Sequence, residues 1–374
     1  MDLDLSDDQQ LLRDTSARFI EDRCPLPHVR ELAASADGVD PTYGRQAADL
    51  GWYSLLVDEE HGGGSVSGKS FADAAIVALE RGRYLQPGAF VPGNVVAWAL
   101  AHYGNDEQQA KVLPAVIAGE RVATWAAADS SGSWEPGAGA TVEPTGSGLR
   151  LAGAKGLVQD AHLAEWLLVT AASPTGLTQL LVPAGAPGVE IVRLDGLDIT
   201  RRFCTVRFSG VELTPADVVG ELGGAAAGID REMQVAAVLT LAESIGAMDQ
   251  DFTVALDYAK VRTAFGRPIG SFQAMKHMLA DTSLLLESSK AIVTAAIEAL
   301  DEEAENAAEV VSMAKAYVGD SAIELAQNCF QTFGGIGFTW EHDQHLYLRR
   351  LTADSSLYGE PAWHRERIWQ LYGL

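Results

Sequence analysis

The sequence predicts an α+β multidomain chain with a helical N-terminal domain, a middle antiparallel β domain and a C-terminal four-helix-bundle domain. Apolar residues recur at helical spacing to about residue 118, and short β-compatible runs broken by Gly, Pro, Ser and Asp follow to about 225. Long helical periods fill the rest. A chain of 374 residues also exceeds one ordinary core. We therefore expect domains at 1–118, 119–225 and 226–374.

Helices build the predicted N-terminal domain. Ser6 and Gln9 form a capping box, because each side chain can bond the other residue's backbone amide at a helix start. The glycines of Glu60-His-Gly-Gly-Gly64 are not followed by Gly-Lys-Ser/Thr, so this stretch is interpreted as a surface loop. Further helical patterns cover about 41–51, 70–83, 92–104 and 106–118.

The two remaining domains are predicted from a change in the spacing of apolar residues along the chain. Once the chain passes Gly228, apolar residues recur every three or four positions in three long series that end near residues 259, 297 and 330. Several long helices side by side predict a bundle. Before them, β-compatible runs occur at 122–128, 149–152, 166–171, 179–182 and 205–208.

Charge and composition exclude several classes of protein. A net charge of −24 argues against a nucleic-acid or anionic-membrane partner, because phosphates would be repelled. The cysteines Cys24, Cys204 and Cys329 are too scattered for a disulfide framework, and the histidines lack metal-ligand spacing, so we expect no metal site. No apolar run reaches the roughly 18 residues of a membrane span. We expect a cytoplasmic protein.

Two motifs carry chemistry. The stretch 262–273 interrupts two long helical patterns at Gly266-Arg-Pro268 and gathers polar groups at a junction that can hold an anion. The stretch 331–337 ends the third long pattern with three glycines, which allow close backbone approach to a ligand. Rossmann, Walker, Gly-x-Ser-x-Gly and His-Glu-x-x-His motifs are absent from the sequence.

These two motifs, at this separation and in this domain order, make the chain resemble the acyl-CoA dehydrogenase family over essentially its whole length. Leu151-Ala-Gly-Ala-Lys155 and Tyr347-Leu-Arg-Arg350 support the resemblance. The resemblance implies an FAD cofactor, an acyl-CoA substrate and α,β-dehydrogenation of its thioester, with electrons passed to an electron-transfer flavoprotein. It also implies a homodimer or tetramer, because family members share the FAD site between subunits.

The resemblance assigns residues to FAD. Arg262 matches the arginine that pairs with the pyrophosphate, a task that suits a bidentate guanidinium. Phe265 and Gln273 match positions around the same dinucleotide. The elements that receive the adenosine-diphosphate part, usually from the adjoining protomer, match Gln331, Gly334, Gly335 and Gly337. The flavin-ring positions match Trp125, Ala127, Ala128, Val158 and Gln159, where Ala128 and Gln159 replace the usual threonines.

The catalytic base is where the sequence departs from the family pattern. The family usually has Tyr-Glu-Gly-Thr, and this chain has Leu357-Tyr-Gly-Glu360, which places Glu360 one position away. Glu360 is either the base or a helix N-terminal acid before a proline. The base position of isovaleryl-type members falls on Ala236, and Glu243 is a weaker alternative.

A third possibility is a chain without a base. Some bacterial members that act on steroid side chains pair unlike subunits, so this chain is alternatively a non-catalytic structural subunit of a heterotetramer. The motifs Gly359-Glu-Pro-x-x-His-Arg365 and Phe338-Thr-Trp-Glu-His342 look closer to such actinobacterial branches. The acyl group, whether short, long, branched or steroid, stays open, as does CoA versus a carrier-protein thioester.

Overall fold

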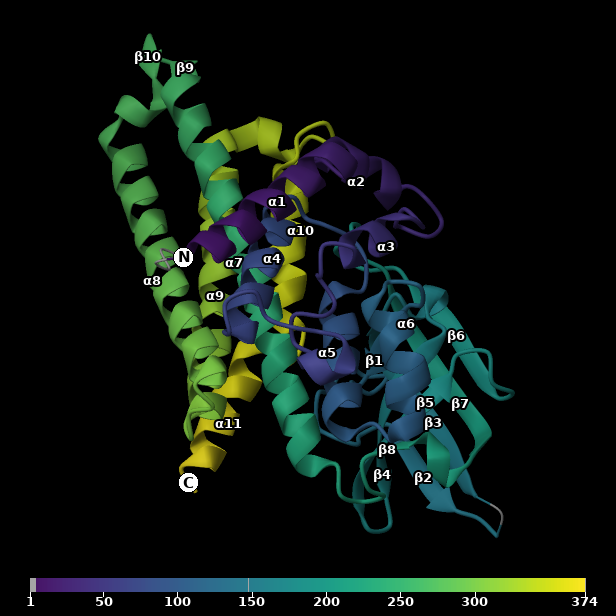
Figure 1. The fold of residues 1–374 in the computed structure, drawn as a ribbon. Coiled ribbons are helices and arrows are strands. Elements are labelled where there is room, and N and C mark those ends of the chain that lie inside the picture. Colours follow the sequence, from purple (N-terminus) through teal and green to yellow (C-terminus); the bar gives the residue numbers. More distant parts are fainter. Residues whose placement is uncertain (1–4, 147, 374) are drawn as a thin grey trace.

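The computed structural model describes residues 5–146 and 148–373. Its N-terminal part is helical, as predicted (Figure 1). The capping box is present: the Ser6 hydroxyl accepts from the Gln9 amide and the Gln9 side chain from the Ser6 amide, both at 3.3 Å. The α-helices are α1 (Asp7–Arg23), α2 (Leu26–Ala33), α3 (Tyr43–Ala48), α4 (Ser70–Arg83), α5 (Phe90–Tyr103) and α6 (Leu113–Ile117), with short helical turns at Glu59–His61 and Gln108–Val112.

The middle part is a sheet in which antiparallel pairs predominate. Its order is β6-β7-β3-β2-β4-β5-β8, with β1 beside β4. Two contacts differ from the prediction, since β1 and β2 each pair with β4 in parallel. The reason is that, after β3, the chain turns so that β4 starts beside the start of β1. The strands are β1 (Ala123–Ala126), β2 (Ala140–Pro144), β3 (Leu149–Gln159), β4 (Trp166–Ser173), β5 (Gly176–Pro183), β6 (Val189–Leu194), β7 (Phe203–Leu213) and β8 (Val218–Val219).

The C-terminal part confirms the predicted helical bundle. Three long helices pack on one another, and α10 and α11 pack on α9. A two-stranded hairpin, β9 (Thr263–Ala264) and β10 (Arg267–Pro268), separates the first two long helices and projects beyond them (Figure 1). The helices are α7 (Ala226–Val261), α8 (Gln273–Asp301), α9 (Ala307–Phe333), α10 (Gln344–Ser356) and α11 (Pro361–Leu371). Where the domain boundaries fall between these parts stays a prediction.

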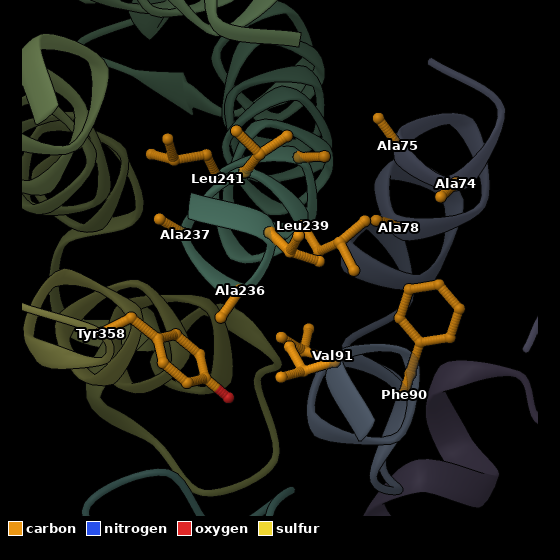
Figure 2. Packing of buried hydrophobic residues seen from close by; sticks show 14 of the residues in the cluster. Ala74, Ala75, Ala78, Phe90, Val91, Ala236, Ala237, Leu239, Leu241 and Tyr358 are labelled. Carbon is orange, nitrogen blue, oxygen red and sulfur yellow. The ribbon is translucent and has the colours of Figure 1, made fainter. Parts of the chain in front are cut away.

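Close backbone contact joins the N-terminal helices to the bundle. A Cβ on Gly82 of α4 would lie 1.9 Å from the Glu243 carbonyl oxygen, and one on Gly246 of α7 would lie 1.9 Å from the Leu79 oxygen. Only glycine permits this approach. Figure 2 shows the adjoining core, with Ala236 of α7 between Tyr358 and Val91. The helical domains therefore share one core.

Candidate active site

An aromatic cluster joins the sheet to the turn between α10 and α11. Tyr358 of that turn stacks on Trp125 of β1, with ring centroids 6.1 Å apart and an interplanar angle of 12°. Trp134 lies 4.8 Å from the same tyrosine ring. Its indole N–H donates to the Ser356 carbonyl at 3.0 Å, and that of Trp125 to the Thr170 hydroxyl at 3.1 Å. The cluster of Trp125, Trp134 and Tyr358 is buried and fixes the turn against β1.

A buried lysine holds the segment that follows β1. Ala127 and Ala128 are buried there. The Lys155 ammonium donates to the carbonyl oxygens of Ala127 at 2.8 Å and Ala138 at 2.6 Å. Burial lowers the pKa of Lys155 to about 8, although Asp129 opposes this. Lys155 therefore positions two loops that border the aromatic cluster.

The end of β3 contributes the other two predicted flavin-ring positions. Gln159 is buried, and its side-chain amide donates to the Gly88 carbonyl at 2.9 Å. Its own carbonyl accepts from the Thr124 hydroxyl at 2.6 Å. Val158, by contrast, packs inside the core of the sheet. The structure thus brings the Gln159 amide to the N-terminal domain and leaves Val158 only backbone atoms for a ligand.

Strained backbone marks the same region. Leu157, Asp160 and Tyr358 have φ of 51°, 52° and 58°, in the left-handed region that side chains other than glycine rarely adopt. Such residues persist only where the surrounding structure imposes them, and they gather at functional sites. Three of them fall in the segments that border the cluster.

Glu243, the weaker candidate base, lies in a buried charge network. Its carboxylate pairs with Arg81 at 3.2 Å and with Arg201, which also pairs with Asp354. Against the effect of burial, the carboxylates of Asp354 and Glu243 raise the pKa of Arg201. The network joins α4, the β6–β7 connection, α7 and α10, so both oxygens of Glu243 already have cationic partners.

Glu360 lies in a different setting. It is exposed at the N-terminus of α11, and its carboxylate accepts no hydrogen bond from the described residues. The preceding Gly359 is buried with φ of 102°, and a Cβ there would lie 2.6 Å from Trp363 and 2.7 Å from His364. Gly359, the position next to Tyr358, therefore has no room for an acidic side chain. At the other expected base position the chain has Ala236, which has no acidic group.

The remaining predicted residues lie at the hairpin end of the bundle. Arg262 is exposed at the end of α7 and forms no ion pair within residues 5–146 and 148–373. Phe265 is 96% exposed at the hairpin tip, where its φ of 51° is followed by Gly266 at 78°. Gln273 begins α8, and its amide lies 2.7 Å from the His277 ring.

The glycine turn after α9 lies at the same end. Tyr258 and Phe333 have ring centroids 4.8 Å apart and bring the ends of α7 and α9 together. A Cβ on Gly334 or Gly335 would meet nothing within 4 Å, so a ligand can approach this backbone closely. Gln331 is exposed and Gly337 is buried.

Together these residues form two half-sites in one chain. The hairpin-end half-site consists of Arg262, Phe265, Gln273 and the Gln331–Gly337 turn. It offers open glycine backbone and a guanidinium that has no ion pair among residues 5–146 and 148–373, and both suit a phosphate group. The sheet half-site, at the cluster, Ala127, Ala128 and Gln159, offers aromatic faces and backbone groups, which suit a flat ring. Figure 1 shows the hairpin and the sheet on opposite sides of the molecule. The two sets of residues fit the two ends of a dinucleotide.

A helical–β–helical chain with these half-sites has the layout of a flavin-dependent oxidoreductase. The family models of the acyl-CoA dehydrogenase N-terminal and C-terminal domains match residues 6–120 and 224–371. The chain belongs to the acyl-CoA dehydrogenase family, FAD-binding oxidoreductases that act on CH–CH groups. None of its helices in the described residues is long and apolar enough to cross a membrane.

Two relatives carry the same name. Acyl-CoA dehydrogenase IpdE2 of Mycobacterium tuberculosis is 31% identical over 95% of this chain and 94% of its own length. IpdE2 of Mycolicibacterium smegmatis is 28% identical over 98% of each chain. Among solved structures, the ChsE4–ChsE5 complex of Mycobacterium tuberculosis is similar with a TM-score of 0.90 at 24% identity, covering 100% of this chain and 99% of that one.

Sequence reasoning missed Trp134, Tyr358 and Lys155 as parts of the site. A signal existed for Tyr358, which stands where the family has the tyrosine before its glutamate. For Trp134 there was none, since its loop reaches Tyr358 only through tertiary packing. The Arg81 and Arg201 partners of Glu243 come from distant segments and leave no sequence pattern.

Proposed function

We propose that this protein catalyses α,β-dehydrogenation of an acyl-CoA thioester in the cytoplasm and passes the electrons to an electron-transfer flavoprotein. When bound, FAD supplies the acceptor for the hydride from the β-carbon. The observation that supports the proposal most is the pair of half-sites, one shaped for phosphate and one for a flat ring. The three free, buried cysteines agree with a reducing compartment.

Residues of this chain have separate tasks in the proposal. Arg262 binds the pyrophosphate, with Phe265, Gln273 and the glycine turn around it. Backbone groups of Ala127, Ala128 and Val158, together with the Gln159 amide, hold the edge of the flavin ring. Trp125 and Tyr358 exclude water from one side. Glu360 removes the α-proton, which requires that substrate or a partner chain cover its exposed carboxylate, because a desolvated base is the stronger one.

The split site implies a second chain. If the half-sites of one chain lie apart, each FAD needs the hairpin-end half-site of one subunit and the sheet half-site of another. A homodimer or a tetramer satisfies this requirement with two-fold symmetry. A heterotetramer with a related subunit satisfies it as well.

The test is anaerobic bleaching of the flavin absorption band in the protein purified alone. Short, long, branched and steroid acyl-CoAs are added in turn. Bleaching by one class of substrate supports a self-sufficient dehydrogenase and identifies the acyl group. A protein with bound flavin that no acyl-CoA bleaches would contradict it.

A second candidate function is that of a non-catalytic structural subunit in a heteromeric acyl-CoA dehydrogenase. Two observations favour it: Glu360 is exposed, and the buried Glu243 and Asp354 are both paired with Arg201. A second similar structure is also described by a pair of protein names, as the Tcur3481–Tcur3483 steroid ACAD. It is 26% identical with a TM-score of 0.87, covering 98% of this chain and 97% of that one. Bleaching that appears only after co-expression with a related subunit would support this alternative.

A further inference from the structure

A cavity that no half-site residue lines lies between the N-terminal helices and the end of the sheet. Its volume is about 250 Å³, and none of the aromatic cluster lines it. The walls come from the segment before α3, the turn before α5, the start of β1 and the residues after β3 (Figure 1). Most of the wall is apolar, and its larger apolar and aromatic side chains are Val39, Tyr43, Tyr53, Val116 and Leu163. The charged side chains of Asp37, Asp40, Arg121 and Asp160 also line it.

One wall carries a buried carboxylate without a hydrogen bond. Asp160 is 1% exposed and lines the cavity, and neither of its oxygens accepts a hydrogen bond from the described residues. An unpartnered buried acceptor costs free energy, so structures rarely retain one without a ligand or water. The Tyr53 hydroxyl, on the same cavity, also makes no hydrogen bond within residues 5–146 and 148–373. On a largely apolar wall, the cavity therefore presents an acceptor and a hydroxyl that make no hydrogen bond with the described residues.

The charges near Asp160 favour a neutral ligand. Burial raises the pKa of Asp160 to about 7, against the opposing effects of the Gln159 amide and of the guanidinium groups of Arg201, Arg202 and Arg81. These positive charges already compensate the carboxylate and disfavour a second cation. A carboxylate ligand is disfavoured by Asp160 itself and by Asp37 and Asp40 on the wall, while Arg121, the cation among the lining residues, already pairs with Glu165.

The volume of the cavity narrows the class of ligand further. An apolar cavity of about 150 Å³ holds benzene, so this one admits a somewhat larger ring. An apolar wall with few convergent polar groups is the usual form of a small-molecule site. We propose that the cavity binds a small, neutral ring compound whose hydroxyl group donates a hydrogen bond to Asp160.

The test uses the purified full chain and cyclohexanol as the probe, with the dissociation constant measured by saturation-transfer NMR. Cyclohexanone, which cannot donate, and cyclohexylamine, which is cationic, are the matched comparison probes. Asp160→Gly removes the carboxylate, and Asp160→Asn keeps an acceptor oxygen without the charge. Both residues tolerate the left-handed φ of 52° at this position, so the backbone is preserved.

We expect cyclohexanol to bind at least about tenfold more weakly to Asp160→Gly and within about threefold of wild type to Asp160→Asn. Cyclohexanone and cyclohexylamine should bind wild type more weakly than cyclohexanol. Val39→Trp, which fills the cavity and leaves Asp160 in place, should abolish binding. The readout needs no flavin, so it is independent of the proposed dehydrogenation.

Three results would overturn the proposal. The first is no binding of cyclohexanol to wild type. The second is an unchanged dissociation constant in Asp160→Gly, which would show that the carboxylate is not the acceptor. The third is tighter binding of cyclohexylamine that Asp160→Asn abolishes, which would make this a cation site.

Discussion

At the scale of single residues, the hairpin-end half-site depends on Arg262. Its exposed guanidinium has no competing carboxylate among the residues that the structure describes, so it is free to form a bidentate contact with a pyrophosphate. We expect Arg262→Ala to weaken FAD binding about 10- to 100-fold, the scale of a charged hydrogen bond. Flavin content and FAD titration measure the effect. Arg150→Ala, at an exposed pair with Glu212, is the control and should bind normally; full flavin occupancy in Arg262→Ala would disprove the assignment.

Glu360 is the second residue-scale prediction. If it is the base, Glu360→Gln should lower turnover by about 100-fold or more, because general-base catalysis contributes on that scale. Flavin should remain bound. Glu366→Gln, on the exposed surface of the same helix, is the matched control. Equal rates in Glu360→Gln and wild type would place the base elsewhere.

Lys155 gives a pH prediction. Burial lowers its pKa from 10.5 to about 8, so between these values the unfolded state binds more protons than the folded state. Stability contributed at this site therefore rises with pH from about 8 to 10. In urea unfolding, the free energy of unfolding of wild type should therefore rise relative to that of Lys155→Met over that range. Parallel pH curves for the two proteins would contradict the buried position.

At the scale of elements, the charge network around Glu243 joins α4, α7 and α10. Glu243→Gln leaves Arg81 and Arg201 buried with weaker partners, and breaking such a pair costs about 3–5 kcal/mol. Urea unfolding should show a loss of this size. Glu190→Gln, at an exposed pair with Arg207, should cost less than about 1 kcal/mol. A stable Glu243→Gln that lacks turnover would instead mark Glu243 as the base.

Helices and strands were predictable from the sequence where one buried face makes apolar residues recur at a regular spacing. Helix α4 matches its predicted range of 70–83, and the third long helix, α9, ends at Phe333, close to its predicted end near residue 330. Strands β2, β6 and the two-residue β8 were missed. Strand β6 is largely exposed and carries Glu190 and Arg193 instead of an apolar run. The parallel pairing of β1 with β4 depends on a turn that brings distant segments together, which no local pattern specifies.

The candidate site, too, has residues that local sequence motifs predict and residues that only tertiary contacts reveal. Arg262 and the glycine turn were identifiable from local motifs, and the structure brings them to one end of the bundle. Tyr358 and Trp134 contribute through contacts between segments more than 200 positions apart in the chain, so sequence spacing could not reveal them. The placement of the hairpin and the sheet on opposite sides of the molecule is likewise a property of the tertiary structure (Figure 1).

At the scale of the whole molecule, the proposed split FAD site predicts that the protein needs to assemble in order to function. The hairpin that carries one proposed half-site and the sheet that carries most of the other lie on opposite sides of the molecule (Figure 1), from which we infer that one chain does not use both ends on the same FAD. Flavin content should therefore depend on association, and dilution or interface mutations should release flavin as the oligomer dissociates. Light scattering combined with flavin absorbance measures both quantities. Full flavin retention in an isolated monomer would contradict the split site.

The most direct test of the split site is complementation between two inactive variants. Arg262→Ala damages the hairpin-end half-site, and Trp125→Ala damages the sheet half-site. In a two-fold dimer with random mixing, half the dimers are mixed and each contains one intact site, so co-expression should restore about one quarter of the wild-type flavin. Each variant expressed alone should be flavin-poor. Co-expressed variants that stay as flavin-poor as either one alone would contradict an FAD site shared between two copies of this chain.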